Sequence, residues 1–190
     1  MTNKKRWEFI PGDEITIAPG RTVKRIRALV AIDGFGVSRG DLGGYVESET
    51  NLAQVYGNAR VYGDAQVYGD AWVSGNAQVY GNAWVSGNAW VYGNAQVYGN
   101  AWVSGNAWVY GDGLIFWASK VGYKNGTLTV YNTKDNTLQV TRGCFVGSVD
   151  EFLEASERKH DDDTHLEYRL LIEIAHSRIT RARANLEADQ

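Results

Sequence analysis

Residues 53–113 read AQVYGNARVYGDAQVYGDAWVSGNAQVYGNAWVSGNAWVYGNAQVYGNAWVSGNAWVYGDG. The unit V-(Y/S)-G-(N/D)-A-x recurs every six residues, and x is Gln, Trp or Arg. Ten valines mark the period, from Val55 to Val109, and an alanine follows each of the first nine at the fourth position. A six-residue period is too short for a helical hairpin repeat and does not match helical periodicity. The stretch therefore predicts a parallel β-helix.

The order of residues within the unit predicts which side chains face inward. Neighbours along a strand point to opposite faces, so x and Tyr/Ser point outward if Val points inward. Alanine after the corner is small enough for a crowded interior. The Gly-Asn or Gly-Asp pair is expected to form each corner, because Gly, Asn and Asp enter left-handed backbone conformations at least cost.

The hexapeptide resembles that of left-handed β-helix proteins, which carry an aliphatic residue and a small residue four positions later. This resemblance implies a left-handed, triangular coil of three hexapeptides, and ten units then give three to four coils. Sorting every third x residue tests the implication. Face A is Gln54, Trp72, Trp90 and Trp108; face B is Arg60, Gln78 and Gln96; face C is Gln66, Trp84 and Trp102. All five Trp of the repeat fall on faces A and C, which supports three sides per coil.

The flanking segments divide the chain into three parts and complete a mainly β fold class. Residues 1–52 are expected to form an N-terminal cap, and residues 53–113 the hexapeptide β-helix. An irregular first coil is expected to begin near Val46, because Leu52 lies six residues further on. Residues 114–190 are expected to form a C-terminal module of short strands and two helices. Ser148 and Thr164 each precede a Glu by three residues, the spacing of a helix capping box.

The chain as a whole resembles a family of uncharacterised phage and prophage proteins. Three features carry the resemblance: GDLGGYVES at residues 40–48, the string of VYGNA units, and the segment from Gly126 to Phe152 that contains RGCF at 142–145. The family's members look like accessory phage genes. The resemblance therefore implies a role in managing the bacterial host.

Composition and charge indicate in which compartment the protein is expected and which partners are not expected. The 190 residues have a formal charge of −3 and one cysteine, Cys144, so an intramolecular disulfide is excluded and a reducing compartment is expected. No apolar run is long enough for a membrane span or a signal peptide, which predicts a cytoplasmic protein of the infected or lysogenic bacterium. The coil and the helical tail are both acidic, so nucleic acid is not expected as the main partner.

Catalysis is not expected. Acyltransferases of this architecture use a histidine base, yet residues 46–113 contain neither His nor Lys. The three histidines, His160, His165 and His176, lie in the C-terminal part. The run HDDDTH at 160–165 is interpreted as a polar loop with capping acids rather than a metal site, and Cys144 as a buried structural thiol. No cofactor and no metal are predicted.

The outward tryptophans are the candidate functional residues, because a monomer rarely exposes so large an apolar patch. Three explanations remain open: a subunit interface, cover by the C-terminal segment, or a stacking platform for a ring-bearing ligand. Small serines beside the Trp rings leave notches that could receive a neighbour's ring, and two Trp faces suit a homotrimer. The predicted interface or ligand platform is Trp72, Trp84, Trp90, Trp102, Trp108, Ser86 and Ser104.

The predicted function is that of a non-enzymatic phage accessory binding protein. It would counter a host defence by binding a host protein or by sequestering a small, nucleotide-like signal molecule. Two alternatives stay open at this point: an acyltransferase-like hexapeptide enzyme, and a virion or tail structural protein.

Overall fold

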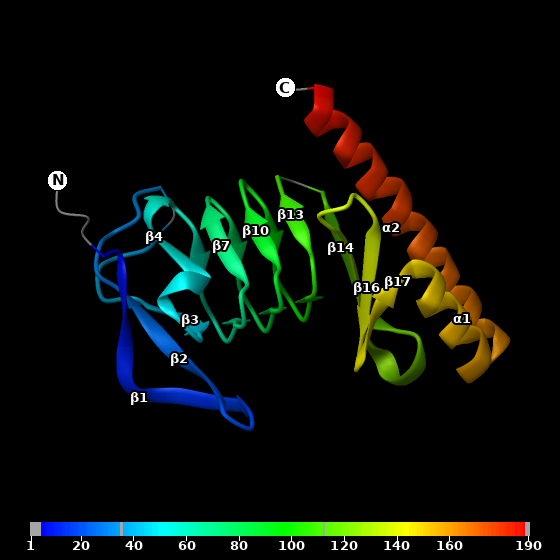
Figure 1. The fold of residues 1–190 in the computed structure, drawn as a ribbon, viewed down its shortest axis with the longest axis horizontal. Coiled ribbons are helices and arrows are strands. Elements are labelled where there is room, and N and C mark those ends of the chain that lie inside the picture. The colour runs from blue at the N-terminus through cyan, green and yellow to red at the C-terminus, as the bar shows by residue number, and fades with distance from the viewer. Residues whose placement is uncertain (1–4, 35, 112, 189–190) are drawn as a thin grey trace.

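The computed structural model describes residues 5–34, 36–111 and 113–188 (Figure 1). An N-terminal hairpin, about four turns of parallel β-solenoid, an antiparallel sheet and two helices follow one another along the long axis. The predicted fold class is confirmed: a mainly β chain with a repeat solenoid between an N-terminal cap and a C-terminal β-plus-helical module.

The N-terminal cap joins the solenoid by sharing one of its sheets. Strands β1 (Trp7–Ala18) and β2 (Arg21–Ala28) form an antiparallel hairpin, and β3 (Leu42–Val46) pairs with β2. On its other edge β3 pairs in parallel with β6, where Val46 lies opposite Val67. The irregular first coil therefore does begin at Val46, as the sequence predicts.

The solenoid consists of short strands in three parallel sheets, one on each side of the coil. A 3-10 turn, η1 (Glu49–Asn51), leads into its first strands. Face A holds β4 (Leu52–Gly57), β7 (Trp72–Gly75), β10 (Trp90–Tyr92) and β13 (Trp108–Tyr110). Face B holds β5 (Arg60–Val61), β8 (Gln78–Val79) and β11 (Gln96–Val97). Face C continues from β3 through β6 (Gln66–Val67), β9 (Trp84–Val85) and β12 (Trp102–Val103).

The register of these sheets confirms the 18-residue coil. Trp90 pairs with Trp108 on face A, Gln78 with Gln96 on face B, and Trp84 with Trp102 on face C. The repeat valines from Val61 to Val109 are at most 3% exposed, and the repeat alanines at most 8%. Valine and alanine thus fill the interior, as the pleat argument predicts. The side chain of Val55 lies outside the described residues.

The first unit of face A departs from the predicted register. Leu52, and not Val55, pairs with Val73, and the regular offset resumes only where Gly57 meets Gly75. The physical reason is that residues 47–52 lack the hexapeptide pattern, so the chain absorbs extra residues before the first regular corner. Gln54 is consequently not stacked on Trp72; its Oε1 accepts hydrogen bonds from the backbone N–H of Arg6 (3.0 Å) and Trp7 (3.4 Å).

The corners are also built differently from the prediction. Only the corner glycines have positive φ, +66° at Gly87 for example, and the described Asn and Asp beside them do not. Expecting left-handed backbone at Asn and Asp is therefore wrong. The asparagine side chains form ladders along the coil instead, such as Asn82 Nδ2 donating to Asn100 Oδ1 at 3.3 Å. The glycines stack closely, and a Cβ on Gly87 would lie 2.8 Å from the nitrogen of Gly105.

The C-terminal module covers the last coil with one side of a sheet and packs its helices on the other (Figure 1). Its antiparallel strands are β14 (Ile115–Val121), β15 (Gly126–Asn132), β16 (Leu138–Arg142) and β17 (Phe145–Ser148), with the short turn η2 (Tyr123–Asn125) between the first two. Helices α1 (Val149–Lys159) and α2 (Asp162–Ala188) follow.

The predicted N-terminal cap is confirmed for α1 and is wrong for α2. The predicted capping box of α1 is confirmed, since Ser148 Oγ accepts from the N–H of Glu151 at 3.2 Å. Thr164 does not cap α2, because the helix begins two residues earlier, and Asp161 Oδ1 accepts from the N–H of Thr164 at 2.7 Å.

Candidate binding surface on the solenoid faces

The repeat places its tryptophans in two rows on adjoining sides of the coil. Trp72, Trp90 and Trp108 lie on face A, and Trp84 and Trp102 lie on face C. In the single chain Trp72, Trp84 and Trp90 are 39%, 43% and 46% exposed. Trp102 and Trp108, in the last coil, are half-buried. The rows thus change from covered to open with distance from the C-terminal module.

One pair of neighbouring indoles in each row meets edge to face. The ring planes of Trp72 and Trp90 are 78° apart with centroids at 5.5 Å, and those of Trp84 and Trp102 are 76° apart at 6.3 Å. Edge-to-face contact is a favourable aromatic geometry, and it does not bury both faces of either ring. Flat apolar ring faces therefore remain available on both rows.

The two serines of the candidate site lie beside the row on face C. Ser86 Oγ donates to Ser104 Oγ at 3.2 Å, and Ser86 is 5% exposed. The backbone N–H of Ser104 donates to the hydroxyl of Tyr131 at 3.1 Å. The structure thus brings both serines together next to Trp84 and Trp102, with their hydroxyls bonded to each other.

The C-terminal sheet covers the last coil through side-chain hydrogen bonds. The backbone N–H of Trp102 donates to Thr129 Oγ1 at 3.1 Å, and the backbone carbonyl of Trp102 accepts from Thr141 Oγ1 at 2.5 Å. On face A, Asn132 Nδ2 donates to the carbonyl of Trp108 at 3.1 Å. Cover by the C-terminal segment therefore reaches the last coil and leaves Trp84 and the other indoles of earlier coils open.

Two cavities form where this sheet overhangs the tryptophan rows. The larger has a volume of about 400 Å³, the smaller about 190 Å³. Solenoid residues lining the larger are Asn82, Trp84, Asn100 and Trp102, and those lining the smaller, six residues on, are Asn88, Trp90, Asn106 and Trp108. The sheet side contributes Arg142 to the larger cavity, and the loop after β15 contributes Lys134 to the smaller.

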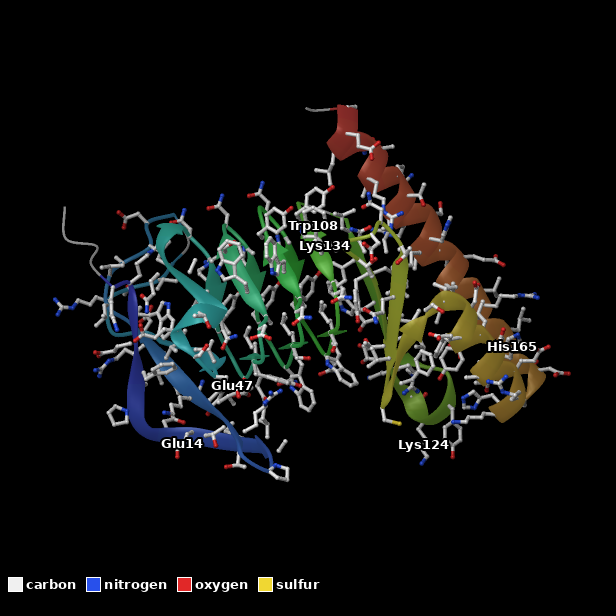
Figure 2. All side chains as sticks on the ribbon, viewed as in Figure 1. Glu14, Glu47, Trp108, Lys124, Lys134 and His165 are labelled. Atoms are coloured by element: carbon white, nitrogen blue, oxygen red, sulfur yellow. The ribbon has the colours of Figure 1, made fainter. Side chains whose placement is uncertain are left out.

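The hexapeptide explains why the two cavities resemble each other. Each combines two indoles, two carboxamides and one basic side chain, and Figure 2 shows Lys134 beside Trp108 at the junction with the sheet. The asparagines are corner residues two positions before each Trp, so the sequence could have placed them. Arg142 and Lys134 carry no such periodic signal, and sequence reasoning missed them.

Face B presents its rings in a different way. Tyr62, Tyr80 and Tyr98 stack nearly parallel, with successive centroids 4.8 Å apart, and Trp117 closes the stack edge-on at 4.4 Å from Tyr98. Burial raises the pKa of both Tyr62 and Tyr80, which keeps their hydroxyls neutral. Because the tyrosines cover one another, this face offers no open ring slot of the kind found on faces A and C.

A further apolar cavity of about 400 Å³ lies at the N-terminal end, where the cap meets the first coil. Trp7, Ile26, Leu52 and Val61 line its interior, and Arg6 lies among its lining residues. Burial lowers the pKa of Arg6, which donates to Asn58 Oδ1 at 3.3 Å. This cavity has no periodic signal in the sequence, because the N-terminal cap lacks the repeat.

The residues considered for chemistry lie apart from the tryptophan faces. No group of three or more His, Cys, Asp or Glu with the geometry of a metal site occurs among the described residues. The His160 ring packs near Tyr123 and Tyr168, with centroids 5.4 and 5.7 Å away. Cys144 is exposed, so the prediction of a buried thiol is wrong: the cysteine follows Gly143 in the turn between β16 and β17.

Comparison with known proteins agrees with the solenoid. The family model of the YdcK beta solenoid repeat matches residues 53–67, 65–78, 77–93 and 95–111. The matched stretch is the hexapeptide region, which is therefore similar to that repeat. No curated protein and no solved structure matches the chain. In the part of the chain that the structure describes, no helix is long and apolar enough to cross a membrane.

Proposed function

We propose that the chain is a phage or prophage accessory protein that binds rather than catalyses. It acts in the cytoplasm of the infected or lysogenic bacterium and counters a host defence, either by occupying a host protein or by sequestering a small signal molecule. The observation that carries the proposal is the exposure of Trp84 and Trp90, 43% and 46%, at the mouths of two equivalent cavities.

Exposed indoles on a rigid coil favour a binding role. Leaving large apolar rings in water is unfavourable, and a patch of them on a soluble surface usually marks an interaction site. The backbone beneath them is fixed by parallel pairing and by the carboxamide ladders, so the rings are held in place before any partner arrives.

The larger cavity suits a planar ring with an anionic group. Its volume of about 400 Å³ falls within the usual range of ligand sites. A ring can stack on the open face of Trp84, and the amides of Asn82 and Asn100 can bond to the polar edge of the ring. Arg142 supplies positive charge and is held by donating to the carbonyls of Val121 (3.3 Å) and Tyr123. A nucleotide has this combination of groups.

The coil sequence lacks the histidine base that hexapeptide acyltransferases use, and this supports binding over that chemistry. Residues 46–113 contain no His and no Lys, and a general base must lie within hydrogen-bond reach of its substrate. The basic side chains next to the cavities are those of Arg142 and Lys134, and their positive charge suits them to holding an anion.

The decisive experiment is recovery of the partner from infected cells. The tagged protein is captured natively, associated proteins are identified, and the sample is then denatured so that released small molecules can be analysed by mass spectrometry. One host protein, or one nucleotide-like compound, that is lost in Trp84→Ala and kept in Gln96→Ala supports the proposal. Equal recovery of every species by both variants contradicts it.

A further inference from the structure

The cavity between the N-terminal cap and the first coil has no role in the proposed function, and we call it the cap cavity. On face B the strand β5 is the edge of its sheet, so no earlier coil packs against it. Ala59 and Val61 there remain 8% and 3% exposed, whereas Val79 and Val97 of the later coils have no exposed surface. Ala59 and Val61 both line the cap cavity, whose volume is about 400 Å³. The cavity therefore lies where an earlier coil would otherwise pack.

The walls of the cap cavity are mainly apolar and come from both the cap and the coil. The cap contributes Trp7, Ile26, Ile32, Val37 and Leu42, and the coil contributes Leu52, Ala59 and Val61. Leu42 is 61% exposed, so the molecule itself leaves part of this apolar lining in contact with water. An aliphatic ligand in the cavity would remove that surface from water, which is favourable.

Two arginines, Arg6 and Arg60, are among the residues that line the same cavity. The guanidinium of Arg6 donates to Asn58 Oδ1 at 3.3 Å, a neutral acceptor two residues before Arg60. Within the described part of the chain Arg6 forms no ion pair with a carboxylate. Burial lowers the pKa of both arginines, so each side chain has lost part of its hydration. An anion bound here would compensate for that loss.

The acidic residue of the lining does not supply this anion. Asp41 Oδ2 accepts a hydrogen bond from the backbone N–H of Ser38 at 2.7 Å, which closes a turn in the cap. Asp41 is in no ion pair among residues 5–34, 36–111 and 113–188. Two guanidinium groups and one carboxylate give the lining a net positive charge, so an anionic ligand is complementary to it.

We propose that the cap cavity binds an amphiphilic anion, an aliphatic chain that ends in a carboxylate. The chain lies against Ile26, Leu52 and Val61, and the carboxylate accepts hydrogen bonds from Arg6 and Arg60. A polar ligand would leave the apolar walls without a partner, and a neutral apolar ligand would leave the guanidinium groups without one. The cap cavity and the tryptophan cavities lie at opposite ends of the solenoid (Figure 1), so this site goes beyond the proposed function.

The first part of the test uses a series of straight-chain carboxylates. Hexanoate, octanoate and decanoate are titrated separately into the full chain by isothermal titration calorimetry. Each added methylene should tighten binding by up to about fourfold while the chain still fits the cavity. Octanol has the same chain as octanoate without the charge, and it should bind at least about tenfold more weakly than octanoate.

The second part of the test separates the head of the ligand from its chain. Arg6→Gln should weaken octanoate binding at least about tenfold and leave octanol binding unchanged, because only the carboxylate uses the guanidinium. Ala28→Leu enlarges a side chain of the lining and should weaken both probes. Arg39→Gln removes an exposed arginine of the same cap that is not among the described lining residues, and it is the matched control.

The outcomes decide between this site and binding elsewhere, provided circular dichroism confirms that each variant is folded. Affinity that rises with chain length, depends on Arg6 for octanoate alone and falls in Ala28→Leu supports the proposal. A wild type that binds no member of the series overturns it. Octanoate binding that is unaffected by Arg6→Gln and Ala28→Leu overturns it as well. Trp84→Ala should bind octanoate as the wild type does, so failure here and failure of the proposed function are distinguishable.

Discussion

Ser104 and Tyr131 exchange two hydrogen bonds at the C-terminal end of the solenoid. The backbone N–H of Ser104 donates to Tyr131 Oη at 3.1 Å, and that hydroxyl donates to the Ser104 carbonyl at 3.0 Å. One coil earlier, the N–H of Ser86 donates to the carbonyl of Val103 at 2.9 Å. A buried phenol thus replaces the next coil as the partner of the last strand, which would otherwise be an open sheet edge.

The first prediction is that Tyr131→Phe destabilises the protein by about 1–3 kcal/mol, because both backbone groups of Ser104 lose their partner in a buried place. Urea unfolding followed by fluorescence measures the change. Tyr123→Phe is the matched control, since Tyr123 is 56% exposed, and its stability should stay within about 0.5 kcal/mol of the wild type. Equal effects of the two variants would mean that the hydroxyl of Tyr131 does not cap the coil.

The second prediction concerns alkaline pH. Burial raises the pKa of Tyr131 far above its ordinary value near 10. Below about pH 10 the folded and unfolded chains both keep this proton, so stability does not depend on it. Above that pH the unfolded chain releases the proton and the folded chain does not, so the free energy of unfolding falls as pH rises. Tyr131→Phe should make that fall shallower between about pH 9 and 11, as measured by urea unfolding.

The third prediction uses glycines with and without a close neighbour. Gly87→Ala should cost about 1–2 kcal/mol for the positive φ, and more for the Cβ that would lie 2.8 Å from the nitrogen of Gly105. Gly143 also has positive φ, +59°, but has nothing within 4 Å of an added Cβ. Gly143→Ala should therefore show the conformational cost alone. Thermal or urea unfolding that ranks Gly143→Ala as the more harmful variant would contradict the stacked corners.

The fourth prediction separates the inner and outer positions of the repeat. Val85 has no exposed surface, so Val85→Asp places a charge in a dry interior without a partner, and soluble expression should fail. Gln78→Asp changes an outward side chain of face B and should be tolerated. Comparison of the soluble fractions is sufficient, and the reverse result would mean that the strands face the other way.

The periodic part of the fold was predictable because each side chain in it repeats a local choice. Pairing of Trp90 with Trp108 follows from counting 18 residues along the sequence. The count fails at Gln54, where the preceding residues lack the hexapeptide and the register shifts. Backbone propensity predicts left-handed conformation at the corner Asn as well as the corner Gly, because it does not say which of two permissive residues takes the positive φ. In the structure it is the glycine.

The candidate site was only half predictable for a related reason. Sequence places the five repeat tryptophans on two faces, and the structure bears out those faces. The sequence does not predict which rings are covered, because their cover depends on Thr129, Thr141 and Asn132. The contacts of these three residues with the last coil have no periodic signal. Arg142, at the end of β16, and Lys134, in the loop after β15, reach the cavities from the same C-terminal module, distant in sequence from Trp84 and Trp90.

The last prediction concerns what the tryptophan faces bind. Trp102 is half-buried under the C-terminal sheet, so the test uses Trp84→Arg with Trp90→Arg, which alters one open indole on each face. Neither ring is covered by the C-terminal sheet, and the melting temperature should change little. Gln78→Arg with Gln96→Arg adds the same charge to face B and serves as the control. Light scattering gives the mass of each variant, and native capture gives its ligands.

The two readouts distinguish the two roles of these faces. If the faces join subunits in a trimer, the Trp variant loses mass, since arginine cannot be buried there without a partner. If they form a ligand platform, as the overhanging cavities favour, the mass is kept and the captured ring compound or host protein is lost, because each stacked ring contributes about 1–3 kcal/mol. A variant that keeps both its mass and its captured partners would remove Trp84 and Trp90 from the binding surface and, with them, the proposed function.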